Sequence, residues 1–136
     1  MERSSSSFKE GEWVMAVIKR IASKATPKKI VSYLTQEEKT EEKLIGGKDC
    51  DPDNVVNDFN MTQELYGKTG GVKYHHIIQS FSPEDNITPE KAHEIGKELA
   101  ESQFKEFEVF VVTHKDKDHI HNHLVVNSVS FENGLK

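Results

Sequence analysis

The sequence predicts an α+β fold, a single domain with a central, mostly antiparallel β-sheet flanked by helices. Alternating apolar segments typical of strands and amphipathic segments typical of helices follow one another in the order β-α-α-β-α-β-β. The last two strands are separated only by the charged residues 115–118, and so short a turn joins antiparallel neighbours. With 136 residues, of which 35% are hydrophobic, the chain can bury one modest core.

The first predicted strand covers residues 14–21 (VMAVIKRI) and follows a serine-rich segment, residues 1–13, that we expect to be a disordered leader. Thr26-Pro27 is typical of a helix N-cap followed by proline at the first helical position, and it predicts a short helix ending near Leu34. The charged segment 36–49 contains two adjacent glycines and is therefore expected to form a loop.

Two further helices and two further strands are expected before the last strand. Each helix is predicted from a proline that opens an amphipathic segment, and each strand from alternating apolar residues. The predicted helices cover 52–66 and 89–103, and the predicted strands cover 72–81 and 107–113. Residues 14–136 thus form the expected domain, and an end so soon after a strand is typical of an incomplete one.

The segment from His114 to Asn127 (HKDKDHIHNHLVVN) holds four of the seven histidines. Three of them, His119, His121 and His123, alternate with other residues, and side chains at i, i+2 and i+4 share one face of a strand. A hairpin with His114 at the end of its first strand brings several imidazoles together. Neutral imidazole is a common ligand of transition metals, and an all-histidine set leaves coordination positions open for a substrate. We therefore predict a metal site, for which alternation alone favours the last three histidines.

Two interpretations remain open for several side chains outside this set. Asp116 and Asp118 either orient an imidazole or a nucleophile, or are solvated turn residues. Tyr33 is either a half-buried core residue or a phenol that meets a phosphate backbone. A phenol becomes a good nucleophile only when its proton is withdrawn or its phenolate is stabilised. His76 and Ser80 share one face of a predicted strand, where they support the metal site or hydrogen bond within the sheet.

The charges are segregated along the chain, although the net charge is only −5. Residues 14–36 hold five basic side chains and no acidic one, whereas residues 37–64 hold nine acidic and three basic side chains. The net charge excludes a protein that coats nucleic acid non-specifically, but it allows a local basic surface. A single cysteine, Cys50, suits the reducing cytoplasm, and no segment is apolar enough to span a membrane. We expect a cytoplasmic protein without a membrane segment.

Three blocks of the sequence resemble, in order, the motifs of the relaxase/mobilisation nuclease family, which belongs to the histidine–hydrophobe–histidine endonucleases. The segment SYLTQEEKT, which contains Tyr33, resembles the nucleophile motif. The segment HIIQSF, which begins at His76, resembles the second motif. Residues 114–128 (HKDKDHIHNHLVVNS) resemble the third, metal-binding motif, which is the most specific of the three. The resemblance spans about Met15 to Gly134 and implies the catalytic core of a relaxase-like fold.

The resemblance also implies roles for the matching residues. Tyr33 would be the nucleophile, and Asp116 would help to activate it. A divalent metal, Mg²⁺ or Mn²⁺, would be bound by His114, His121 and His123. The supporting residues would be His119, His76 and Ser80. DNA phosphates would be contacted by Lys19, Arg20, Lys24, Lys28 and Lys29. Asn122 departs from the pattern, because the family name implies a hydrophobic residue between the last two histidines.

The function implied by the resemblance is metal-dependent, strand-specific nicking and religation of DNA at a transfer origin, through a 5′-phosphotyrosine, for plasmid mobilisation. Its partners would be single-stranded DNA, accessory relaxosome proteins and a coupling protein. Two alternatives remain open. One is a rolling-circle replication initiator or single-strand transposase with the same kind of site, and the other is a non-catalytic metal- or DNA-binding remnant.

Overall fold

The computed structural model describes residues 2–7, 13–116 and 119–136, and it confirms the predicted α+β class. The strands are β1 (Glu2–Ser7), β2 (Trp13–Ser23), β3 (Ile45–Lys48), β4 (Tyr74–Phe81), β5 (Val109–Asp116) and β6 (His119–Asn127). The helices are α1 (Lys28–Leu34), α2 (Val55–Leu65) and α3 (Pro89–Gln103), with short 3₁₀ helices η1 (Glu42–Leu44) and η2 (Pro83–Asp85). The strands form one sheet in the order β1-β2-β4-β6-β5-β3, and each neighbouring pair is antiparallel.

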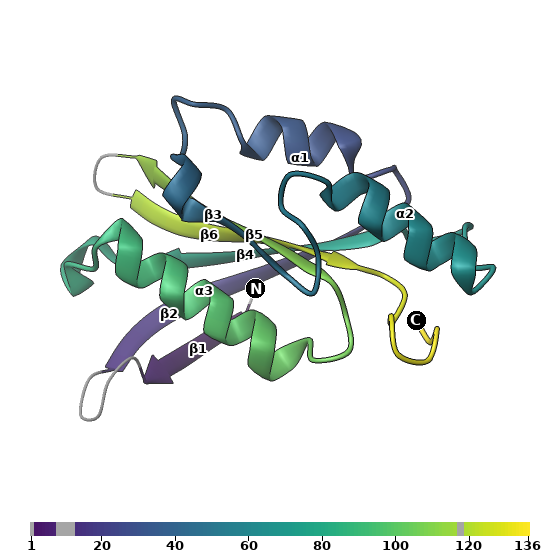
Figure 1. Ribbon diagram of the computed structural model, residues 1–136. Coiled ribbons are helices and arrows are strands. Elements are labelled where there is room, and N and C mark those ends of the chain that lie inside the picture. The colour runs from purple at the N-terminus through teal and green to yellow at the C-terminus, as the bar shows by residue number, and fades with distance from the viewer. Residues whose placement is uncertain (1, 8–12, 117–118) are drawn as a thin grey trace.

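The sheet separates two layers of helices, with α1 and α2 on one face and α3 on the other (Figure 1). Because side chains alternate along a strand, each face has its own apolar cluster. The cluster under α1 and α2 contains Leu34, Val55, Phe59, Tyr74, Phe110, Val112 and Val125. The cluster under α3 contains Ile77, Ala100, Val109, Val111, Leu124 and Val126. Membership of one cluster or the other therefore shows which face of the sheet a residue of β5 or β6 lies on.

The boundaries of α3 agree with the sequence prediction, because its start is capped as the sequence implies. The Thr88 side-chain oxygen accepts a hydrogen bond from the backbone N–H of Lys91 at 3.1 Å, and Pro89 occupies the first turn. Helix α1 differs in one detail, because Pro27 is its N-cap and no side chain caps it. Its last residue, Leu34, lies in the core, whereas Tyr33 lies on the outside.

The prediction of a loop over residues 36–49 is wrong for part of that segment. Residues 42–44 form η1, and β3 follows and pairs with β5, with Gly46 opposite Val111. Two adjacent glycines disfavour a strand locally, but pairing with a long buried neighbour outweighs that preference. Gly47 is required there, since a Cβ atom at this position would lie 2.3 Å from the backbone oxygen of Cys50.

The structure also differs from the expected disordered leader. Residues 2–7 form β1, which pairs with β2 so that Ser4 lies opposite Ala16. Backbone hydrogen bonds make this pair, so a serine-rich sequence does not prevent it. The rest of the predicted leader, residues 1 and 8–12, lies outside the described residues, as do residues 117 and 118 of the predicted turn.

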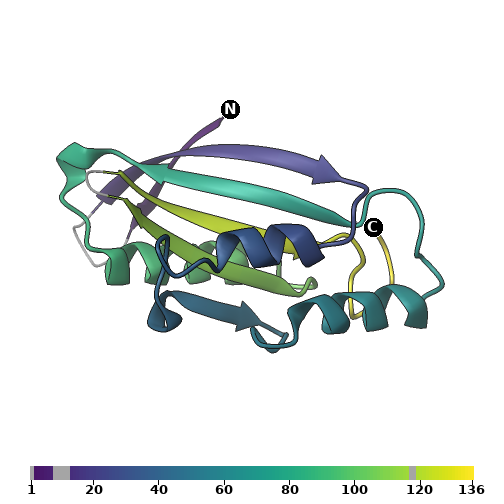
Figure 2. The same cartoon turned by 90° about the horizontal axis from the view of Figure 1, so that it is seen from above.

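Part of the sheet face that carries α1 is left uncovered. Seen from above, α1 lies over β5 and β6, whereas β4 and β2 lie beside it without a covering helix (Figure 2). The exposed side chains on this part of the sheet include Lys19 and Ile21 of β2 and Ser80 of β4. No helix within the described part of the chain is long and apolar enough to cross a membrane.

Candidate active site

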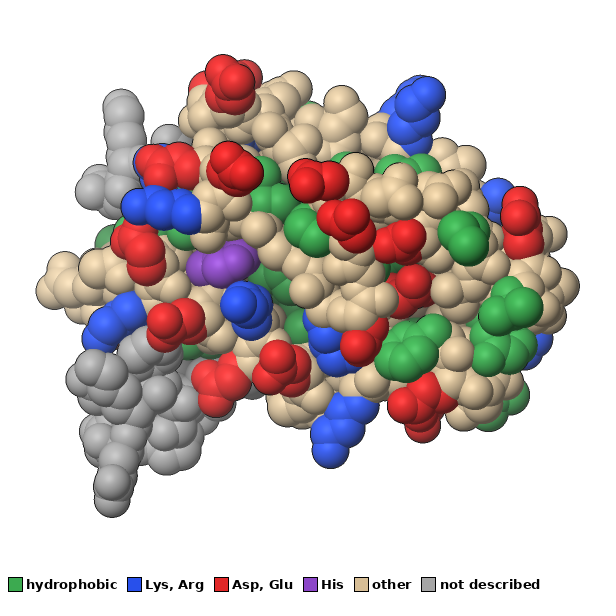
Figure 3. Space-filling view, viewed as in Figure 1, with side chains coloured by type: hydrophobic (Ala, Val, Ile, Leu, Met, Phe, Trp, Pro, Cys, Tyr) green, Lys and Arg blue, Asp and Glu red, His purple; other side chains and the backbone are tan. Residues whose placement is uncertain are grey.

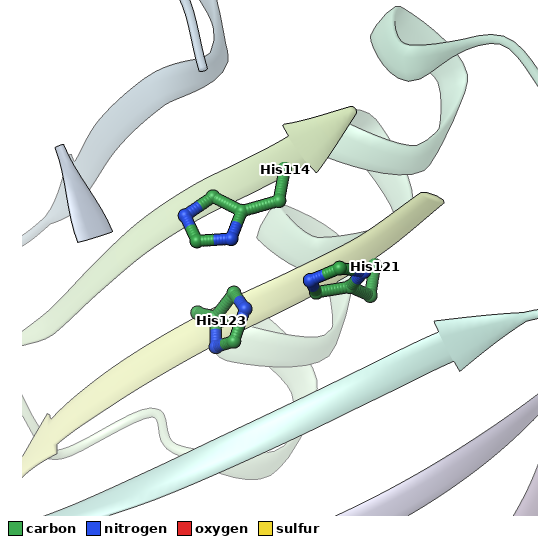
Figure 4. Close-up of side chains that lie close together, drawn as sticks. All are labelled: His114, His121 and His123. Atoms are coloured by element: carbon green, nitrogen blue, oxygen red, sulfur yellow. The ribbon is translucent and has the colours of Figure 1, made fainter. Parts of the chain in front are cut away.

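Three histidines come together on the α1 side of the sheet, at the end of the β5–β6 hairpin. His114 lies on β5 directly opposite His121 on β6, and His123 lies opposite Val112. One ring nitrogen from each histidine lies within 4.8 Å of the others, a spacing that a single metal ion can bridge. Figure 4 shows the three rings close together on neighbouring strands. The antiparallel register therefore brings one histidine of β5 beside two of β6.

The outer nitrogens of two of these rings are held by protein groups. Nε2 of His114 lies 2.8 Å from the backbone oxygen of Leu34, and Nδ1 of His123 lies 2.8 Å from Nε2 of His76. A carbonyl oxygen only accepts, so Nε2 of His114 carries the hydrogen and Nδ1 keeps its lone pair. Metal-binding histidines usually donate their second nitrogen in this way.

The other ring nitrogen of His123, Nε2, is buried without a hydrogen-bond partner among the described residues. A buried polar atom without a partner is costly, and a bound cation would satisfy it. Burial, reinforced by His114, His121 and His76, lowers the pKa of His123 to about 2. Burial also lowers the pKa of His114 and of His76. These imidazoles are therefore neutral at physiological pH, which is the form that binds metals. The residues present fit a divalent metal.

Tyr33 and the three histidines open onto the same cleft, which has a volume of about 640 Å³. Tyr33 lies on α1, one residue before the Leu34 carbonyl that contacts His114. Half of its surface, 50%, is exposed, and it is not among the buried residues of the core. Nζ of Lys39 lies 3.0 Å from the phenolic oxygen. The cleft thus combines a phenol, a cation and a set of imidazoles.

The other predicted site residues lie around this centre. His119 is exposed and lies opposite Asp116, outside the group of three that share the 4.8 Å spacing. The backbone of Asp116 belongs to β5, but its side chain lies outside the described part of the structure. Ser80 is exposed and lies opposite His121. His76 contacts His123 directly, and is the supporting residue that the structure brings closest to the triad.

The five predicted DNA-binding side chains are all exposed, but they do not share one face. They are Lys19, Arg20, Lys24, Lys28 and Lys29. On β2, Lys19 lies opposite Ile78, which in turn lies opposite His123, so Lys19 faces the histidine side of the sheet. Arg20 lies opposite Ile77, a residue of the cluster under α3, and so faces the other side. On the face shown in Figure 3, basic and acidic side chains of the described residues are mixed.

Lys39 lines the cleft, but nothing in the sequence singles it out. It lies six positions after Tyr33 and 75 positions before His114, so only the fold brings the three together. The one local signal is the position of Lys39 in SYLTQEEKT, where it is the only basic residue after the tyrosine.

The sequence also gives no role to a buried polar network on the α3 face, directly behind the histidines. Asn122 donates to Gln79 at 3.0 Å and to the Ala92 carbonyl at 2.6 Å, and its oxygen accepts from Thr113 at 2.6 Å. Nδ1 of His93 lies 2.9 Å from the Thr113 hydroxyl. Because Asn122 stands between His121 and His123, the departure from the family pattern is a fully buried and hydrogen-bonded residue.

An antiparallel sheet with paired histidines on a central strand and a tyrosine lining the same cleft is the arrangement expected of a relaxase-like nuclease domain. The family model for the MobA/VirD2-like relaxase nuclease domain matches residues 33–136. The chain therefore belongs to this relaxase family.

Curated relatives agree with this assignment. Protein rlx of Staphylococcus aureus is 43% identical over 117 residues, which cover 86% of this chain and 34% of the relative. The group II intron-interrupted relaxase LtrB of Lactococcus lactis subsp. cremoris is 41% identical over 92 residues, 67% of this chain and 16% of the relative. The chain thus spans about a third or less of the length of these relatives.

Proposed function

We propose that this chain carries the site for metal-dependent, site- and strand-specific nicking and religation of DNA at a transfer origin, in the mobilisation of a plasmid or related element. The observation that supports this most is the shared cleft of Tyr33, His114, His121 and His123. A phenol beside a metal-binding set of imidazoles suits transfer of a phosphoryl group to the protein. The proposed location is the cytoplasm.

The proposed metal ligands are His114, through Nδ1, His123, through Nε2, and His121. A divalent metal bound there, Mg²⁺ or Mn²⁺, would withdraw charge from the non-bridging oxygens of one phosphate. Three imidazoles without a carboxylate favour Mn²⁺ or softer ions in vitro, whereas Mg²⁺ is the abundant ion in cells. The contacts of His114 with Leu34 and of His123 with His76 hold the rings in the orientation that leaves those nitrogens available.

In the proposed reaction, the Tyr33 oxygen attacks the phosphorus of the scissile phosphodiester. A bond forms between the phenolic oxygen and phosphorus, and the bond from phosphorus to the 3′-oxygen breaks. The phenolic proton passes to an acceptor, for which we propose Asp116, and the 3′-oxygen takes up a proton and leaves as a hydroxyl. The product is a 5′-phosphotyrosine. The reverse attack by a 3′-hydroxyl restores the DNA, because the phosphodiester is exchanged and not hydrolysed.

The proposed substrate is single-stranded DNA that lies across the uncovered part of the sheet. Strands β2 and β4 offer this surface beside the triad, and Lys19 lies on it. Lys24, just after β2, and Lys28 and Lys29, in the first turn of α1, are exposed, and we propose that they contact phosphates of the strand that leads toward Tyr33. Accessory relaxosome proteins and a coupling protein are the further partners we propose.

The test is incubation of the chain with a labelled single-stranded oligonucleotide that carries a transfer origin, with Mn²⁺ or Mg²⁺. We expect a covalent protein–DNA adduct that Tyr33→Phe abolishes. Oligonucleotides with a replication origin or a transposon end, run in parallel, test the related nuclease functions. A chain that binds metal and DNA but forms no adduct would be a binding remnant, and the proposed function would be wrong.

A further inference from the structure

Lys39 makes two contacts with the side chain of Tyr33. Its Nζ lies 3.0 Å from the phenolic oxygen and 4.2 Å from the centre of the ring. Both side chains line the cleft that holds the three histidines. The ammonium group is therefore in contact with the atom that attacks phosphorus in the proposed reaction.

The backbone at Lys39 is fixed against β5 on both sides of His114. The carbonyl oxygen of Lys39 accepts a hydrogen bond from the Lys115 N–H at 3.1 Å. The next residue, Thr40, is buried, and its hydroxyl donates to the Thr113 carbonyl at 2.7 Å. A turn hydrogen bond from the Lys39 N–H to the Gln36 carbonyl, at 2.9 Å, closes the segment. These bonds hold the backbone of Lys39 beside the strand that carries His114, and its side chain reaches the Tyr33 hydroxyl.

We propose that Lys39 is a catalytic residue that stabilises negative charge on the Tyr33 oxygen. This inference rests on the proposed role of Tyr33 as the nucleophile. As the phenolic proton leaves, the oxygen gains negative charge, and its attraction to the ammonium group at 3.0 Å becomes stronger than that of the neutral phenol. In the religation direction the same oxygen leaves phosphorus as a phenolate, and Lys39 stabilises it again.

The rival explanation is that Lys39 only binds a DNA phosphate. That explanation predicts a loss of DNA affinity that saturating DNA overcomes. If Lys39 instead stabilises the phenolate, its removal lowers the rate of the chemical step even when all of the enzyme is bound to DNA. Single-turnover rates at saturating oligonucleotide therefore separate the two explanations.

The variants to compare are Lys39→Met, Lys39→Arg and, as a matched control, Lys43→Met. Lys43 is a neighbouring lysine that pairs with Glu41 and Glu90, at 3.6 and 3.1 Å, and does not line the cleft. We expect Lys39→Met to lower the single-turnover rate of adduct formation by about 100-fold, as removal of one transition-state donor usually does. Lys39→Arg keeps the charge and should lose less than about tenfold, and Lys43→Met should match the unmodified chain.

A fluorinated nucleophile sharpens the test. With 3,5-difluorotyrosine at position 33, the phenol has a lower pKa and depends less on a nearby cation, so the loss caused by Lys39→Met should shrink. An adduct on Tyr33 that forms equally fast with and without Lys39, or a loss that the fluorinated tyrosine leaves unchanged, would overturn the role of Lys39 alone. Absence of any adduct from the unmodified chain would overturn both Lys39 and the proposed function.

Discussion

Nε2 of His76 on β4 lies 2.8 Å from Nδ1 of His123 on β6, so one histidine orients another from the neighbouring strand. For Nε2 of His123 to face a metal, Nδ1 must carry the hydrogen and His76 must accept it. His76 thereby acts on the metal site without being one of its three proposed ligands.

Replacing His76 by leucine should weaken metal binding by about 10- to 100-fold, the usual cost of losing such a partner. His76→Gln, whose amide oxygen can accept the same hydrogen bond, should recover part of the loss. Isothermal titration with Mn²⁺ measures both. The control is His75→Leu, since His75 lies on the opposite side of β4, opposite Val126. Equal losses in His75→Leu and His76→Leu would show that orientation of His123 is not the cause.

The stability of the metal-free chain should fall as the pH drops below about 6.5. The pKa of His123 is lowered from 6.5 to about 2, and those of His114 and His76 are also lowered. Below the unfolded pKa the unfolded chain binds protons that the folded chain does not, so stability is present above that pH and is lost as pH falls. Each histidine contributes at most about 1.4 kcal/mol per pH unit.

Urea unfolding in the presence of a chelator, measured at several pH values between neutral and mildly acidic, checks this dependence. In His123→Gln the fall should be shallower, because one of the groups that protonate on unfolding is gone. An identical slope in the unmodified chain and in His123→Gln would contradict the assigned shift.

The network around Asn122 should matter for the metal site as well as for stability. Asn122→Leu removes the hydrogen bonds of Asn122 with Thr113, Gln79 and the Ala92 carbonyl, which should cost about 3 kcal/mol of unfolding free energy. It should also lower Mn²⁺ affinity, because Asn122 fixes the strand between His121 and His123.

A matched control for Asn122 lies further along the same strand. Asn127 is equally buried and hydrogen bonds with Gln63, Glu108 and the Phe59 carbonyl, away from the histidines. Asn127→Leu should cost similar stability and leave Mn²⁺ affinity unchanged at a temperature where both variants are folded. If both variants lose metal affinity equally, the Asn122 network acts only through general stability.

Lys19 and Arg20 should differ in their effect on DNA binding, since they face opposite sides of the sheet. Lys19→Gln should weaken binding of a single-stranded oligonucleotide and reduce the slope of log affinity against log salt by about 0.7, the value for one phosphate contact. Arg20→Gln should leave both quantities unchanged. Fluorescence anisotropy over a range of salt concentrations distinguishes them. A larger effect for Arg20→Gln would place the DNA on the α3 side.

The sequence carries enough local information for the longer elements of this fold. Helix α3 has a capping threonine, a proline and a clear amphipathic pattern, and its observed bounds are those expected. Strands β3 and β1 have weak local signals, a pair of glycines and a run of serines, and they form because a long neighbouring strand offers backbone partners. Such long-range pairing is not visible in a single sequence.

In the candidate site, too, some features can be predicted from the local sequence and others depend on the fold. Strand alternation identifies the histidine segment but ranks His119 with His121 and His123, because it cannot show which residue of β5 lies opposite. The register, with His114 opposite His121, comes from the hairpin, and the resemblance to relaxases favours the same triad. The contact between Lys39 and Tyr33 depends on how the segment after α1 packs against β5, and no spacing in the sequence encodes it.

We propose that Tyr33 forms the covalent bond with DNA. The chain contains two other tyrosines: Tyr74 is buried, and Tyr66 donates to the Phe131 carbonyl at 2.9 Å. The most direct measurement is peptide mass spectrometry of the protein–DNA adduct after nuclease and protease digestion. We expect the nucleotide on the peptide that contains Tyr33, joined through a 5′-phosphate. A nucleotide on any other residue, or a cleaved oligonucleotide with no modified peptide, would contradict the claim.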